Sequence, residues 1–153
     1  MRTSPPTLVG ILGRNGVAVD KDHVVVAITY LPRLVRIPIN PDGSAGVPEV
    51  LVPASSFLSA GVYGLDGIAL DVHGNVYAAA IAPRVIARIS REGKEISRAA
   101  GAAEGVTGAP FGLAFGTGKG HREALFVTIG PMFGGVDDAL ARVPVGVPGM
   151  PVP

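Results

Sequence analysis

Two polar side chains stand directly before a glycine at matching places in this 153-residue sequence, and both are of a type that binds metal ions. They are Asn15, which precedes Gly16, and Asp66, which precedes Gly67, and they lie 51 residues apart. An amide carbonyl and a carboxylate are hard oxygen donors, which suit calcium or magnesium. The same dipeptides are also common in turns where a strand begins, so the residues alone leave both interpretations open.

Other kinds of active site need residue patterns that this sequence lacks. His23, His73 and His121 have no metal-ligand spacing, which argues against a dedicated zinc site. The segment Gly116-Thr-Gly-Lys-Gly120 lacks the earlier glycine and the following Ser or Thr of a phosphate-binding loop. There is no Gly-x-Ser-x-Gly motif for a nucleophilic serine, and the absence of cysteine excludes disulfide and thiol chemistry.

A repeated pattern of short apolar strands must position Asn15 and Asp66. Each copy opens with a glycine and an apolar strand, continues with a second apolar strand, and ends with a third strand that carries an arginine. The copies begin at Gly16, Gly67 and Gly112, which are 51 and 45 residues apart. A period of roughly 40–50 residues that holds several short strands is typical of β-propeller blades.

The composition agrees with an all-β protein. The 22 glycines and 14 prolines suit short strands joined by tight turns, and 48% hydrophobic residues against 16% charged argue against disorder. A net charge of +1 with scattered basic residues provides no surface for nucleic acid or an anionic membrane. The arginine of each third strand is expected to be a solvated charge whose stem lies on the sheet; these residues are Arg36, Arg88 and Arg142. No signal peptide or transmembrane segment is recognised, so the cytoplasm is the default expectation.

We therefore expect an all-β fold, a partial β-propeller of three four-stranded blades that is half of a six-bladed ring. Residues 1–153 form this single unit, and its parts are an entry strand or tail at 1–12, blades at 13–60, 61–105 and 106–146, and a Pro-rich tail at 147–153. Because proline lacks the N–H that a regular ladder requires, the tail is expected to lie extended on the surface or to fray. Residues Pro53 to Gly64 are expected to form a crossover loop.

The repeats resemble a known family of propellers. Asn15-Gly-Val-Ala-Val-Asp20 is similar to the Asn-Gly-Ile-Ala segment of the gluconolactonase/regucalcin (senescence-marker-protein) family. Leu65-Asp-Gly-Ile-Ala-Leu-Asp-Val-His-Gly-Asn-Val-Tyr77 is similar to its Asp-Gly segment, and Leu125-Phe-Val-Thr128 resembles a strand of its last blade. The likeness extends over about residues 13–150. It implies a six-bladed, metal-dependent propeller, to whose C-terminal half this chain corresponds.

The resemblance also implies a site and a reaction. In that family a Glu, an Asn and an Asp bind a divalent cation on the propeller axis, and Asn15 and Asp66 match the last two. The expected ion is Ca²⁺, with Mg²⁺, Mn²⁺ or Zn²⁺ as alternatives. The Glu and the substrate-contacting residues correspond to the N-terminal half and are not carried over. A complete site would hydrolyse a lactone or related ester, with Asp66 also acting as the catalytic proton acceptor.

Two other functions remain as alternatives: a non-catalytic propeller segment that binds a protein or small ligand, and a truncated inactive product. Three blades leave two blade faces without a neighbour, which marks an interface or an aggregation hazard. The chain is expected to form an open arc, to pair with a second copy and close a ring, or to complement a separately encoded N-terminal half. A homodimer would bring two Asn15–Asp66 pairs to one axis, and on this ground we expect self-association. The active form would take a small-molecule lactone, and no nucleic-acid or membrane partner is expected.

Overall fold

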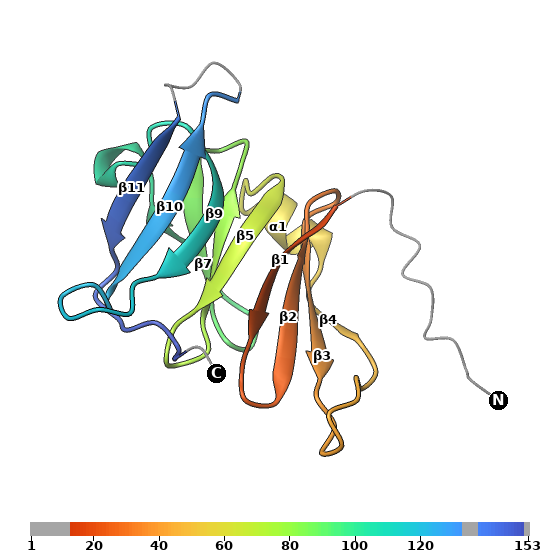
Figure 1. The fold of residues 1–153 in the computed structure, drawn as a ribbon. Helices are drawn as coiled ribbons and strands as arrows, with labels where there is room; N and C mark the ends of the chain where they lie inside the picture. The colour runs from red at the N-terminus through yellow and green to blue at the C-terminus, as the bar shows by residue number, and fades with distance from the viewer. Residues whose placement is uncertain (1–12, 133–137, 152–153) are drawn as a thin grey trace.

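Three antiparallel sheets make up most of the described chain (Figure 1). The structure is a computed structural model that describes residues 13–132 and 138–151. Blade 1 contains β1 (Arg14–Val19), β2 (His23–Ile28), β3 (Arg33–Pro38) and β4 (Glu49–Val52). Blade 2 contains β5 (Leu65–Leu70), β6 (Val76–Ala80), β7 (Val85–Ile89) and β8 (Ile96–Ala100). Blade 3 contains β9 (Ala109–Phe115), β10 (Ala124–Gly130) and β11 (Ala139–Pro144). Sequence neighbours pair throughout, so each blade is an up-and-down meander.

The hairpin turn between β5 and β6 illustrates how the sequence forms these meanders. Gly74 lies there at φ +80°, a left-handed conformation that glycine adopts without steric cost. The buried carboxylate of Asp71 accepts hydrogen bonds from the backbone N–H groups of His73 and Asn75, both at 2.9 Å. It also accepts one from Nδ2 of Asn75 at 2.8 Å. Asp71 therefore holds the turn together and has a structural role.

The first strands of the three blades lie side by side, with β1 next to β5 and β5 next to β9 (Figure 1). The repeated glycines allow this approach. A Cβ atom on Gly16 would lie 2.7 Å from the backbone nitrogen of Ile68, and one on Gly67 would lie 2.7 Å from the carbonyl oxygen of Phe111. No side chain fits at either place, so glycine is required wherever one inner strand meets the next.

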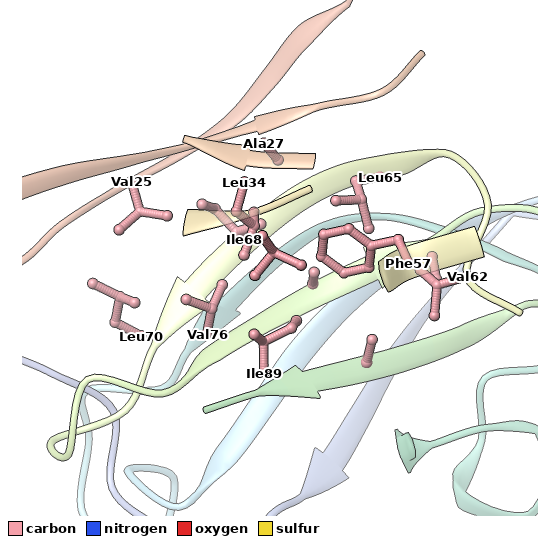
Figure 2. Close-up of a cluster of buried hydrophobic side chains, with 14 residues drawn as sticks. Val25, Ala27, Leu34, Phe57, Val62, Leu65, Ile68, Leu70, Val76 and Ile89 are labelled. Atoms are coloured by element: carbon pink, nitrogen blue, oxygen red, sulfur yellow. The ribbon is translucent and has the colours of Figure 1, made fainter. Parts of the chain in front are cut away.

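The hydrophobic core lies between the blades in two clusters. The larger cluster joins blade 1 to blade 2 and contains residues from β2, β3 and β4 on one side and from β5, β6 and β7 on the other. Figure 2 shows its side chains, among them the ring of Phe57. The smaller cluster joins blade 2 to blade 3 through residues such as Tyr77, Ile86 and Leu125. Packing one sheet face against the next is what buries the apolar side of each blade.

The structure differs from the sequence expectations in three details. Blade 3 has three strands within the described residues, where four were expected. The crossover segment includes a short helix, α1 (Ala54–Ser59), whose Phe57 is fully buried. The tail is extended, as expected, but it does not fray: Met150 N donates to Leu70 O and Val72 N donates to Pro148 O, both at 2.9 Å. The expected entry strand or tail at 1–12 and the last two residues of the tail lie outside the described residues.

Within the described part of the chain, no helix has the length and apolar character needed to cross a membrane.

Candidate metal half-site

Asn15 and Asp66 lie together at the start of two neighbouring inner strands. Asn15 is the second residue of β1, and Asp66 is the second residue of β5. Because Gly16 packs directly against the backbone of residues 66–68, the two side chains come within reach of each other. The side-chain amide of Asn15 hydrogen-bonds the carboxyl group of Asp66. The repeat spacing therefore places the two predicted ligands side by side.

Partial burial of Asp66 determines its electrostatics. Desolvation raises the pKa of its carboxyl group above the ordinary value of 3.8, and the hydrogen bonds from Asn15 and from the Gly67 backbone oppose this shift. Removing water from a carboxylate disfavours its charged form, and a nearby positive charge offsets that cost. Asp66 is thus a carboxylate that a cation would stabilise, and it is a stronger base than an exposed aspartate.

The donor set suits a hard divalent cation but is incomplete within one chain. Asn15 and Asp66 each offer a side-chain oxygen, whereas Ca²⁺ takes about 6–8 oxygen ligands. The corresponding position of blade 3 is Phe111, which offers none. Among residues 13–132 and 138–151, no cluster of three or more His, Cys, Asp or Glu side chains could hold a metal. Within the described residues, the pair is therefore a candidate for only part of a metal site.

A buried polar network lies farther along β5 and β6. The hydroxyl of Tyr77 hydrogen-bonds with the carboxylate of Asp71 and with the guanidinium of Arg88. Burial raises the pKa of Tyr77 above 10.0, and the negative charge of Asp71 adds to that effect. The link between Tyr77 and Arg88 follows from their pairing across β6 and β7, which no short motif in the sequence reveals. Since Tyr77 belongs to the core cluster between blades 2 and 3 and Asp71 is fully buried, we assign the network to stability.

The three repeated arginines make different local contacts. Arg36 pairs with Glu49 at 2.7 Å on blade 1, Arg88 joins Tyr77 on blade 2, and Arg142 donates to the carbonyl oxygen of Gly120 at 2.9 Å on blade 3. All three lie on the sheets, but Arg88 interacts with a buried tyrosine and is not simply the solvated charge that was expected; none forms part of a shared site with Asn15 and Asp66.

A pocket of about 550 Å³ lies at the opposite ends of the inner strands. It is lined by residues 17–19 of β1, residues 68–70 of β5, residues 113–117, Arg122 and residues 149–151 of the tail. Its walls are mostly apolar, and neither Asn15 nor Asp66 belongs to them. The pocket is therefore separate from the Asn15–Asp66 pair.

Comparison with known proteins identifies the architecture. No protein-family pattern and no curated sequence matches the chain. Its fold is similar to that of a luciferin-regenerating enzyme (TM-score 0.71, 19% identity, 92% of this chain and 48% of that chain). It is also similar to a putative gluconolactonase (TM-score 0.64, 18% identity, 90% of this chain and 40% of that chain). A third neighbour is a calcium-binding protein, regucalcin, from Agrobacterium tumefaciens (TM-score 0.66, 21% identity, 89% of this chain and 47% of that chain).

These neighbours confirm the predicted fold, a partial propeller of the gluconolactonase and regucalcin kind. The chain spans less than half the length of each neighbour. At 18–21% identity the likeness concerns the fold.

Proposed function

We propose that Asn15 and Asp66 hold a divalent cation, Ca²⁺ in the first instance, and that the chain supplies half of a metal-dependent hydrolytic site for a lactone or related ester. The observation that carries this proposal is the contact between the Asn15 amide and the partly buried carboxyl group of Asp66. The fold shared with a calcium-binding regucalcin and a putative gluconolactonase supports the choice of ion and of substrate class.

Asp66 and Asn15 would have different roles in hydrolysis. A cation bound at the pair supplies Lewis acidity that polarises the ester carbonyl and acidifies water nearby. Asp66 would accept a proton from the attacking water through the carboxylate oxygen that does not bind the cation. Asn15 would orient Asp66 through their hydrogen bond and would leave its amide oxygen as a neutral ligand.

Thermal unfolding with and without calcium tests this proposal. A ligand that binds only the folded state at about 100 times its Kd adds about 2.7 kcal/mol, which corresponds to a rise in Tm of roughly 5–10 °C for a chain of this size. We expect this rise for the native sequence and its loss in Asp66→Asn, which keeps the shape of the side chain but removes the charge. Glu92→Gln is the matched control, because Glu92 lies exposed in the β7–β8 turn.

A native chain whose Tm is the same with calcium as with a chelator would refute the proposal. An Asp66→Asn variant with an undiminished calcium response would refute the assigned ligands. The first result would favour the alternative in which the chain is a non-catalytic segment that binds a protein or small ligand.

A further inference from the structure

Each blade presents the same residue pattern to the blade that follows it. We call this side the leading face and define it by three positions per blade: the inner-strand glycine and a residue pair across the second and third strands. The pair is Ala27 and Leu34 in blade 1, Ala79 and Ile86 in blade 2, and Thr128 and Leu140 in blade 3. The three pairs occupy equivalent register positions, so blade 3 carries a docking surface of the same layout, with Thr128 in place of alanine.

The leading face is covered in blades 1 and 2 and open in blade 3. Leu34 and Ile86 are fully buried, whereas Leu140 is 68% exposed. Gly16 and Gly67 each face the backbone of the next inner strand, whereas a Cβ on Gly112 would meet only the hydroxyl of Thr128, at 3.2 Å. Blade 3 has therefore kept the glycine that admits a further inner strand, but within the described chain no strand lies there.

Blade 1 carries the complementary surface, which we call the trailing face. In blade 2 this side is formed by Ile68 and Leu70 of β5. Blade 1 covers both residues, which are only 6% and 5% exposed. The equivalent positions in β1 are Val17 and Val19, which follow Gly16 as Ile68 and Leu70 follow Gly67. They are 58% and 42% exposed. The β1 edge of blade 1 thus presents exposed valines of the type that blade 2 buries, whereas Ile28 and Val35 on the same side of blade 1 are already buried, at 5% and 2% exposed.

Opposite charges lie at the same end of the two open faces. A Cβ on Gly130 would lie 3.5 Å from Oδ1 of Asp138, which places this carboxylate beside the end of β10 on blade 3. Arg33 begins β3 at the corresponding end of blade 1, opposite Ile28. The Nε of Arg33 is buried and has no hydrogen-bond partner. Docking of the two faces would therefore bring a carboxylate to the end of the blade at which this guanidinium lies.

We propose that two copies of this chain close one propeller ring, with the leading face of blade 3 in each copy packed on the trailing face of blade 1 in the other. The contact continues the blade 1–blade 2 and blade 2–blade 3 interfaces of the chain itself. One chain covers 40–48% of each structural neighbour, so two copies supply the length of one ring. A two-fold axis closes it with two identical contacts. The ring also places two Asn15–Asp66 pairs around one axis, a consequence that rests on the proposed function.

Sedimentation velocity on the whole chain tests the ring. The native sequence should sediment as a compact particle of twice the 15.5 kDa chain mass. Leu140→Glu and Val17→Glu should each be monomeric, because each spoils both contacts of a homodimer. A mixture of the two variants should regain a dimer, because one contact then joins an intact blade 3 face to an intact blade 1 face. Val47→Glu is the control: Val47 is 79% exposed and precedes β4 outside either face.

A subtler variant keeps the surfaces apolar. Gly112→Ala adds one methyl group where β9 would meet β1 of the second copy, so we expect loss of the dimer without loss of the folded monomer. A monomeric native chain, an open polymer, or a dimer that persists in Leu140→Glu would each overturn the proposal.

Different results refute the proposed ring and the proposed metal site. A dimer whose Tm does not respond to calcium refutes the proposed function and leaves the ring intact. A monomer that calcium stabilises refutes the ring and leaves the function intact. If both hold, the Leu140→Glu monomer should bind Ca²⁺ at least about tenfold more weakly than the dimer, because the number of oxygen ligands sets the affinity.

Discussion

Replacement of Gly67 by alanine should destabilise the protein far more than the same replacement at Gly112. Both glycines open an inner strand at the same place in the repeat. A Cβ on Gly67 would lie 2.7 Å from the carbonyl oxygen of Phe111 and 3.0 Å from the backbone nitrogen of Leu113. A Cβ on Gly112 would meet only the Thr128 hydroxyl, at 3.2 Å.

The size of the effect follows from what must move. At Gly67 the obstacle is the backbone of β9, which cannot rotate away, so β5 and β9 must separate by several tenths of an ångström. Overpacking of this kind costs about 1–3 kcal/mol, and we expect about 2–3 kcal/mol because the neighbouring atoms are backbone. That loss corresponds to a fall in Tm of roughly 5–10 °C for a chain of this length. At Gly112 the only obstacle is the side-chain oxygen of Thr128, which a shift of a few tenths of an ångström relieves, and the expected change is below about 1 kcal/mol.

Urea denaturation of both variants measures this difference, with Leu140→Glu added to each so that self-association does not contribute. The expected result is a clear fall in the free energy of unfolding for Gly67→Ala and a much smaller one for Gly112→Ala. Equal losses, or a Gly67→Ala variant as stable as its parent, would show that the inner strands do not approach as described.

Three further predictions concern individual side chains. In the presence of a chelator, NMR titration should give Asp66 a pKa above 3.8, and Asn15→Ala should raise it further by removing a hydrogen bond to the carboxylate. The folded state then holds the proton more tightly than the unfolded state. The contribution of Asp66 to the free energy of unfolding should therefore fall as the pH rises from 3.8 through the raised pKa, and Asp66→Asn should abolish this fall. Asp71→Ala should lower the free energy of unfolding in urea by about 3 kcal/mol, because it leaves buried donors unpaired. Phe57→Ala should lower it by about 3–5 kcal/mol through the cavity it creates, and a loss under about 1 kcal/mol would contradict the buried position of this ring.

The glycine repeat carries most of what the sequence could predict. Its spacing identified the inner strands, because only glycine permits their close approach, and so it placed Asn15 beside Asp66. Helix α1 was missed because six residues with one buried side chain, Phe57, have no apolar periodicity. The sequence did not predict that the tail is hydrogen-bonded to blade 2, because only the missing N–H groups of its prolines were considered. Pro148 accepts a hydrogen bond through its carbonyl, and Met150, which is not proline, donates one.

The sequence could not predict whether further ligands complete the proposed metal site, for a different reason. A cation site on a propeller axis draws ligands from blades that lie far apart in sequence, and the third repeat of this chain places Phe111 where the others place Asn15 and Asp66. Local patterns show which residues begin each inner strand. They do not show which blades share an axis.

Side-chain NMR during a calcium titration observes both proposed ligands at once. We expect saturable shifts of the Asp66 carboxyl carbon and the Asn15 side-chain amide, with no change at Glu92. Resonances of Asp66 and Asn15 that stay fixed at millimolar Ca²⁺ would contradict the proposed site.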